Sequence, residues 1–310
     1  SEYNSDLVKN LSFIDVVFIL KKGFINKLKL IFKINLLKID YMLIVDGKDR
    51  SILLSYFILA KKKIYALNKK KFSFFLKFNK RNLIYDDEKK DTKINIIKKI
   101  QNKIKINFSE KDTNILEKEF FSDKLNNKDL NSLDGINYNL LHYDEKWIKK
   151  LYIESYKSIE LNNIELKKFA EGIINRSKTN LVITSGKFSS ESLDSLKLSM
   201  EHVGNKVYKK KINNFFLYYV ERPNFYELID LIRKSKLCIT CHGSATHISS
   251  SFNNKTIDII DGSKISLYRA YTSHLKNYNE IIREDSKTTT EKIFNLLWFK
   301  YKIIYLIKVY

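Results

Sequence analysis

The segment from Asn224 to Asp261 constrains the fold of this chain more than any other. It reads NFYELIDLIRKSKLCITCHGSATHISSSFNNKTIDIID. Asn224 and Glu227 have the spacing of a capping box, and the apolar residues that follow them recur at helical spacing. Residues 237–240 and 256–260 are short, β-branched runs bounded by polar turns, which predicts buried strands. Such an alternation of helix and strand predicts two parallel strands of an open α/β sheet, joined by a helix.

The turn between the two predicted strands reads Cys241-His242-Gly243-Ser244-Ala245-Thr246-His247. It lies at the carboxyl end of a strand and at the amino end of a helix. Open α/β sheets bind their ligands at such edges, and the free N–H groups of a helix N-terminus favour anions. We therefore expect this turn to bind an anion.

The same segment resembles the donor-site segment of the heptosyltransferase-like glycosyltransferases, glycosyltransferase family nine. The pattern of that family is an apolar strand, then Asp-Thr-Gly-x-x-His, then a helix of small residues. His242, Gly243, Ser244 and His247 fill these positions, so the final histidine and the helix match, whereas the Asp-Thr-Gly does not. The resemblance implies that these residues and Ala245 hold the diphosphate of a nucleotide-sugar donor. Alternatively, His247 is a histidine whose hydrogen bonds are satisfied on the inner face of its helix.

Two further positions match the donor site of the family. Lys146 follows a predicted strand at 138–142 and stands beside Trp147. In the family, a lysine here faces the donor's phosphates. Glu191 lies where the family commonly has a glutamate that contacts the nucleoside. Both residues also have a simpler interpretation, because most lysines lie on the surface and a helix N-terminus favours a carboxylate whatever its function.

The first half of the chain repeats the order of strand, turn and helix, with a strand expected at 41–45 and a helix at 51–60. The turn between them holds Asp46, Arg50 and Ser51. The resemblance implies that these three residues lie near the acceptor. The alternative is that Asp46 and Arg50 only cap the turn and pair with each other.

The two halves together resemble the two-domain GT-B architecture, so we expect an α/β chain of two Rossmann-like domains with mainly parallel sheets. The first domain is expected to be incomplete or divergent at its start. We expect an acceptor-side domain at 1–130 and a nucleotide-sugar-binding domain at 131–290. A helix at 291–310 is expected to pack back on the first domain or to lie on a membrane surface. The polar segment 126–135 is the predicted linker. A further strand is expected at 13–20.

The formal net charge of +22 suits an anionic membrane, phosphorylated small molecules or nucleic acid. The basic residues are spread over most segments and form no nucleic-acid-binding motif, which favours a solvated basic surface over a specific nucleic-acid site. Cys238 and Cys241 are the only cysteines. We interpret them as buried structural thiols in a reducing cytoplasm. No convincing Asp-x-Asp metal motif is present, and no cofactor is expected.

The resemblance implies that the chain is a metal-independent bacterial glycosyltransferase. It would move a sugar, of which heptose is one candidate, from a nucleotide-diphospho-sugar to a lipopolysaccharide or other glycan acceptor. The expected location is the cytoplasm, with peripheral contact to the cytoplasmic face of the inner membrane. The general base is unassigned, because the aspartate that serves the family near the chain's start is not identifiable. The alternatives are an inactive glycosyltransferase-like binding protein, a basic nucleic-acid-associated protein and a nucleotide-sugar epimerase.

Overall fold

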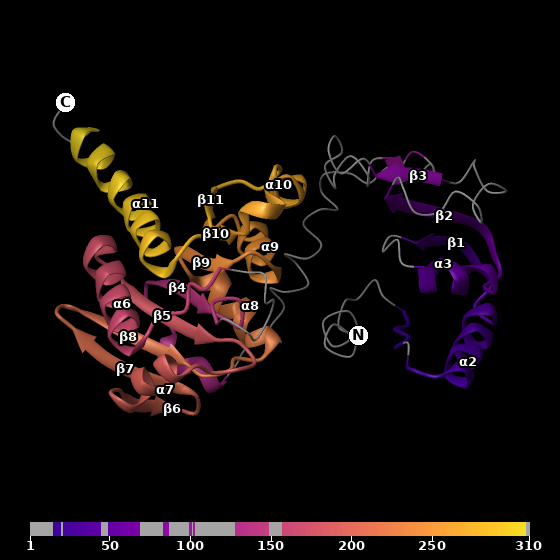
Figure 1. Ribbon diagram of the computed structural model, residues 1–310. Helices are drawn as coiled ribbons and strands as arrows, with labels where there is room; N and C mark the ends of the chain where they lie inside the picture. Colours follow the sequence, from indigo (N-terminus) through magenta and orange to yellow (C-terminus); the bar gives the residue numbers. More distant parts are fainter. Residues whose placement is uncertain are drawn as a thin grey trace. The chain divides into compact units, whose positions relative to one another are not determined.

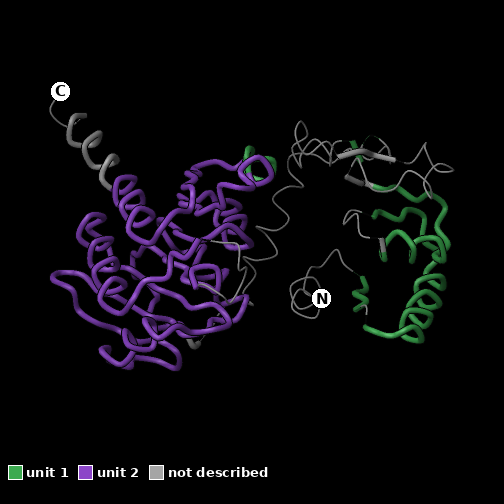
Figure 2. Tube along the Cα trace, viewed as in Figure 1, with its two compact units in different colours: residues 1–119, 269–274 green, residues 120–268, 275–310 purple. Residues whose placement is uncertain are grey.

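The computed structural model describes residues 15–19, 21–44, 49–68, 83–86, 99–100, 102, 128–148 and 157–307. These residues form helices and two sheets of mainly parallel strands (Figure 1), which confirms the predicted α/β class. The chain divides into two compact units (Figure 2). Unit 1 comprises residues 1–119 and 269–274, and unit 2 comprises residues 120–268 and 275–310.

Unit 2 is built on an eight-stranded sheet with the strand order β11-β10-β9-β4-β5-β8-β7-β6. The strands are β4 (Tyr138–Tyr143), β5 (Asn180–Ser185), β6 (Glu201–Gly204), β7 (Val207–Ile212), β8 (Phe215–Val220), β9 (Leu237–Cys241), β10 (Lys255–Ile260) and β11 (Tyr278–Ile282). The pairings from β11 to β8 are parallel, whereas β7 pairs antiparallel with both β8 and β6.

The helices of this part of the chain follow the capping signals of the sequence. They are η4 (Lys128–Leu133), α6 (Asn163–Ser177), α7 (Glu191–Leu198), α8 (Phe225–Lys234), α9 (Ser244–Ser251), η5 (Gly262–Lys264), α10 (Ile265–Thr272) and α11 (Ser286–Ile307). The predicted capping box of Asn224 and Glu227 opens α8, and Asn162 and Glu165 make the same arrangement at α6. The boundary between the units falls within α10.

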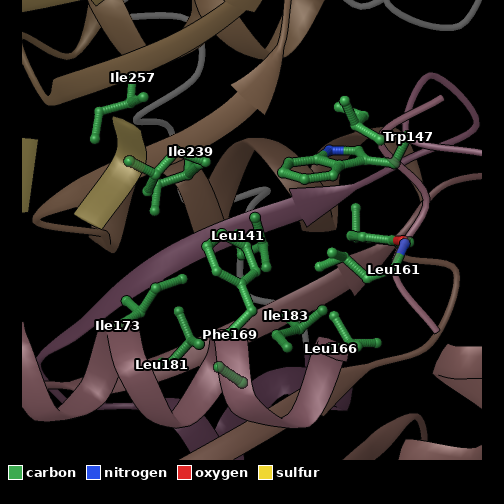
Figure 3. Close-up of a cluster of buried hydrophobic side chains, with 14 of the residues drawn as sticks. Leu141, Trp147, Leu161, Leu166, Phe169, Ile173, Leu181, Ile183, Ile239 and Ile257 are labelled. Carbon is green, nitrogen blue, oxygen red and sulfur yellow. The ribbon is translucent and has the colours of Figure 1, made fainter. Parts of the chain in front are cut away.

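One face of the large sheet is covered by α6, as Figure 3 shows. Its residues Leu166, Phe169 and Ile173 recur at helical spacing, and they pack against Leu141 of β4 and Ile183 of β5. The first half of α11 joins the same cluster, which buries Ile293 and Leu297. Among the described residues, no helix has both the length and the apolar character needed to cross a membrane.

The other face of the sheet has its own core, and this core includes part of the predicted linker. Leu130 and Leu133 of η4 are buried with Tyr138, Leu231 and Ile232. The segment 126–135 is rich in polar residues, but its two leucines are three positions apart and therefore share one side of a 3-10 turn. Residues 128–135 thus belong to unit 2 and are not an open linker.

Unit 1 contains a three-stranded parallel sheet in the order β1-β2-β3. Its elements are α2 (Phe24–Asn35), β1 (Ile39–Ile44), α3 (Asp49–Tyr56), β2 (Ala60–Asn68) and β3 (Leu83–Asp86). Ile44, Ile52 and Tyr65 form its small core, and the hydroxyl groups of Ser55 and Tyr65 lie 3.1 Å apart. Residues 15–19, which fall in the strand expected at 13–20, form no strand.

Candidate functional site

The strand order of unit 2 reverses between β4 and β9. From β4 the chain continues through α6 to β5 and then to β8 on one side, and it returns through α8 to β9 on the other side. The carboxyl ends of the two adjacent parallel strands β4 and β9 therefore carry connections that lead in opposite directions. Such a topological switch point is where open α/β sheets bind their ligands. The loops after Tyr143 and after Cys241 meet at this edge.

Lys146 and Gly243, both predicted as donor-binding residues, lie against each other at the switch point. A Cβ atom added to Gly243 would lie 2.4 Å from Nζ of Lys146, so the absence of a side chain leaves room for the ammonium group. Asp144 contacts both the side chain and the backbone of Lys146. Its carboxylate lies 3.0 Å from Nζ of Lys146 and accepts a 3.1 Å hydrogen bond from the backbone N–H of Lys146. The side chain of Lys146 is 17% exposed, so this cation is held in place and is still reachable from solvent.

Glu145, the neighbour of Lys146, connects the loop after β4 (residues 144–148, the β4 loop) to the loop after β5. Its carboxylate accepts hydrogen bonds from the backbone N–H groups of Lys187 and Phe188. A Cβ atom on Gly186 would lie 2.5 Å from this carboxylate, so Gly186 is needed for the close approach. Glu145 thus contacts the loop after β5 at Gly186, and its neighbour Lys146 contacts the loop after β9 at Gly243.

Two buried side chains fix the backbone of the β4 loop. The indole N–H of Trp147 donates a 3.0 Å hydrogen bond to the carbonyl of His142, and its ring stacks on Tyr143 at 4.9 Å between centroids. Arg283, which follows β11 and is only 6% exposed, donates from Nη2 to the carbonyl of Lys146. The position of Lys146 is therefore set by the packed interior and not by a mobile surface loop.

Residues 242–247 comprise the turn after β9 and the first turn of α9, which begins at Ser244. Nδ1 of His242 lies 2.7 Å from the Asp258 carboxylate, and the rings of His242 and His247 meet edge to face at 5.5 Å between centroids. Ser244 is exposed, whereas the side chain of Ala245 is buried in the core.

The backbone amides of this loop are not equivalent. The N–H of Gly243 already donates to the hydroxyl of Thr246 at 3.2 Å. The amides of Ser244 and Ala245 are in the first turn of α9, where N–H groups have no acceptor within the helix.

Glu191 is the first residue of α7, whose N-cap is Ser190. It lines an open cavity of about 630 Å³ together with Ser158, Glu160, Leu161, Asn162, Asn163, Ile164, Glu165 and Ser192. This cavity lies at the amino ends of α6 and α7, and neither Lys146 nor the loop 242–247 lines it. The structure thus brings Lys146 together with His242 and Gly243, but it places Glu191 in a separate hollow.

The three acceptor-side candidates belong to unit 1. Asp46 lies outside the described residues. Arg50 and Ser51 are in the first turn of α3, where Arg50 is exposed and Ser51 is half-buried. The predicted pairing of Asp46 with Arg50 therefore stays a prediction.

Burial controls the titration of the groups beneath the switch point. It raises the pKa of the Cys238 thiol to about 12 and raises the pKa of Cys241 further, so both thiols stay protonated and buried as predicted. Burial also lowers the pKa of His142, although the neighbouring Asp144 raises it. His142 therefore stays neutral near pH 7, with its Nδ1 2.8 Å from the hydroxyl of Thr184. No cluster of metal ligands is present in the described ranges.

Sequence reasoning missed Asp258, Arg283 and Tyr278. Asp258 had a signal: it is a charged residue inside an apolar strand, and charged residues are almost never fully buried unless they are paired. Tyr278 is the first residue of β11 and Arg283 follows its last residue, and the sequence did not predict this strand.

The fold is similar to that of known proteins, although comparisons of the sequence find no match. No protein-family model matches the chain, and no curated protein matches its sequence. Among solved structures, a family 9 glycosyl transferase from Veillonella parvula DSM 2008 has 15% identity and a TM-score of 0.53, over 88% of this chain and 74% of that one. The E. coli heptosyltransferase WaaC with ADP has 7% identity and a TM-score of 0.55, over 87% and 76%. In its fold, the chain is similar to the heptosyltransferase-like glycosyltransferases of family nine.

Proposed function

We propose that the chain transfers a sugar from a nucleotide-diphospho-sugar to a glycan or glycolipid acceptor. The observation that carries the proposal is the cation of Lys146, held by Asp144 and seated against Gly243 at the switch point. An ammonium group at this edge suits a diphosphate, because it is a compact positive charge with N–H donors for the phosphate oxygens.

Sugar transfer needs stabilisation of the departing diphosphate, a base for the acceptor hydroxyl and orientation of both substrates. In this proposal Lys146, His242, His247 and the amides of Ser244 and Ala245 stabilise the diphosphate. Glu191 holds the nucleoside in its own hollow, and Arg50 lies on the acceptor side. The charge of the leaving group is met by these residues without a metal. The general base stays unassigned.

A more specific proposal concerns the identity of the donor sugar and of the acceptor. The E. coli heptosyltransferase of similar fold was solved with ADP. We therefore propose an ADP-linked heptose as the first donor to test, and a lipopolysaccharide core or another bacterial glycan as the acceptor.

A calorimetric titration with nucleoside diphosphates and nucleotide sugars tests this proposal. We expect at least one nucleoside diphosphate to bind, and binding should weaken about tenfold in His247→Ala, the loss of one hydrogen bond to a charged group. Equal binding of every nucleotide by the wild type and this variant would contradict the site. Binding without any sugar transfer would instead favour an inactive glycosyltransferase-like binding protein. Tighter, salt-sensitive binding to RNA or DNA would favour a nucleic-acid partner.

We also propose that unit 1 contacts an anionic membrane on its cytoplasmic side. The predicted location for this contact was the helix at 291–310, but the buried Ile293 and Leu297 of α11 pack in the core of unit 2. The helix α2 instead buries no residue and presents an apolar stripe. Phe24 is 74% exposed and Phe32 is 66% exposed, and Leu28 and Leu36 continue the same four-residue spacing.

The charges beside this stripe favour an anionic lipid surface as its partner. Lys29 and Lys33 are exposed along one side of α2, and the helix contains no acidic residue. Near its end, Lys38, Lys61 and Lys63 line an open cavity of about 420 Å³ with Leu59 and Ala60. Lysines next to exposed aromatic and aliphatic side chains are typical of a helix that lies in a membrane interface.

Vesicle sedimentation tests the membrane contact. Binding to vesicles that contain phosphatidylglycerol should fall about 10- to 100-fold in Phe32→Ser, because about 1.5–3 kcal/mol of apolar burial is lost. Lys29→Glu should weaken it similarly, since each lysine near an anionic surface contributes about 1 kcal/mol. Leu198→Ser is the control, because Leu198 is 89% exposed on unit 2. Equal binding to neutral vesicles, or a dimer in solution that Phe32→Ser dissociates, would contradict the proposal.

A further inference from the structure

Asp258 is a carboxylate inside the sheet of unit 2. It lies in the middle of β10 and is fully buried. Three side chains donate hydrogen bonds to it: His242 from Nδ1 at 2.7 Å, Tyr278 from its hydroxyl at 2.9 Å and Thr246 from its hydroxyl at 2.9 Å. Removing a carboxylate from water is costly, and three donors are the kind of compensation that a buried charge requires.

The carboxylate fixes the tautomer of His242. Since Asp258 only accepts hydrogen bonds when ionised, Nδ1 of the imidazole must carry a proton. Nε2 is then the ring nitrogen on the side away from Asp258. The ring is also fixed in orientation, because Tyr268 lies 4.5 Å and His247 lies 5.5 Å from it between ring centroids. A histidine whose other nitrogen is held by a carboxylate is a common way to orient an imidazole toward a ligand.

The same carboxylate also organises the backbone of the loop. The hydroxyl of Thr246 donates to Asp258 and accepts from the N–H of Gly243. Gly243 is the residue against which Nζ of Lys146 lies. One buried group in β10 therefore sets both the imidazole of His242 and the position of the backbone next to the Lys146 cation.

We propose that Asp258 is a positioning residue for the donor's diphosphate. It holds His242 so that Nε2 and the Lys146 ammonium meet the phosphate groups together, at the carboxyl ends of β9 and β4. His242 has a side chain that is 13% exposed, so its ring is accessible to a ligand while its partner is not. This inference rests on the proposed nucleotide-sugar function and adds the residue that shapes the phosphate site.

Calorimetry with inorganic pyrophosphate and ADP tests the inference through Asp258→Asn. We expect about a tenfold loss of affinity for both ligands, as for one hydrogen bond to a charged group. Tyr278→Phe removes one hydrogen bond to Asp258 without touching His242, so it should weaken binding less. In a double-mutant cycle, the effects of His242→Ala and Asp258→Asn should be clearly less than additive, because Asp258 acts in part through His242.

The matched control is Asp230→Asn. Asp230 is also a buried aspartate, but it pairs with Arg233 and Lys234 on α8. This variant should lose stability and keep its affinity for pyrophosphate. If Asp230→Asn and Asp258→Asn weaken binding equally, or if the effects of His242→Ala and Asp258→Asn are additive, Asp258 has only a structural role and the proposal is overturned.

Nitrogen chemical shifts of the His242 imidazole separate this inference from the proposed function. The wild type should show the tautomer with a proton on Nδ1, and Asp258→Asn should lose this preference. An imidazole protonated only on Nε2 in the wild type would overturn the inference even if nucleotides bind. If the shifts agree but neither pyrophosphate nor any nucleotide binds, the proposed function fails, whereas the orientation of His242 by Asp258 stands.

Discussion

Replacing Lys146 with methionine is expected to weaken the binding of nucleoside diphosphates by about 10- to 100-fold, because a charge-assisted hydrogen bond contributes about 1.5–3 kcal/mol. Methionine keeps most of the length of the side chain and removes its charge. The effect should be large because Lys146 is anchored by Asp144 before a ligand arrives, so that little side-chain freedom is lost on binding. Isothermal titration with ADP and UDP measures the change.

The control for this experiment is Lys197→Met. Lys197 also forms an ion pair, 2.7 Å from Glu221, but it lies on α7, away from the ends of β4 and β9. It should change nucleotide affinity by less than about twofold, because a partly exposed pair contributes little even to stability. If Lys146→Met binds as tightly as Lys197→Met, the diphosphate does not meet Lys146.

Trp147→Ala is expected to lower the free energy of unfolding of unit 2 by about 3–5 kcal/mol, the usual cost of truncating a buried aromatic residue. Trp147 is fully buried, stacks on Tyr143 and lies 6.2 Å from the ring of Phe169 on α6 (Figure 3). The substitution leaves a cavity and also removes the N–H donor that the carbonyl of His142 accepts. Urea denaturation, followed by hydrogen exchange of the β4 and β5 amides, measures the loss.

Trp147→Phe separates packing from hydrogen bonding. It keeps most of the ring volume and loses the indole N–H, so its cost should be roughly 1–3 kcal/mol, as for a buried carbonyl left without its donor. If the free energy of unfolding of Trp147→Ala lies within about 1 kcal/mol of the wild-type value, the Trp147 ring does not stabilise the β4 loop.

Much of unit 2 could be predicted because its elements carry local signals. The capping boxes of α6 and α8 depend on residues only three positions apart, and the buried strands β4, β5 and β9 are short segments with apolar residues at their centres. The strand β11 was missed because its sequence, YNEII, has polar residues before two isoleucines. It becomes a strand because β10 offers it a parallel partner, which is a tertiary effect.

The candidate site could be predicted only in part, for the same reason. The positions of Lys146, His242 and Gly243 followed from turns at strand ends and from the family resemblance. The contacts of Glu145 with the loop at Gly186, and of Asp258 with His242, could not be predicted. Each joins segments whose proximity depends on the order of strands in the sheet, and this order is not visible in any single stretch of sequence.

The most direct test of the proposed site is to locate a bound nucleoside diphosphate. Backbone amide chemical shifts of the wild-type protein, recorded during a titration with ADP and UDP, provide this measurement. We expect the largest changes in chemical shift at Lys146 and at residues 242–247, which include the first turn of α9, with smaller changes around Glu191. Changes confined to other surfaces of unit 2, or spread over its exposed lysines without a maximum at these residues, would contradict a diphosphate site at the ends of β4 and β9.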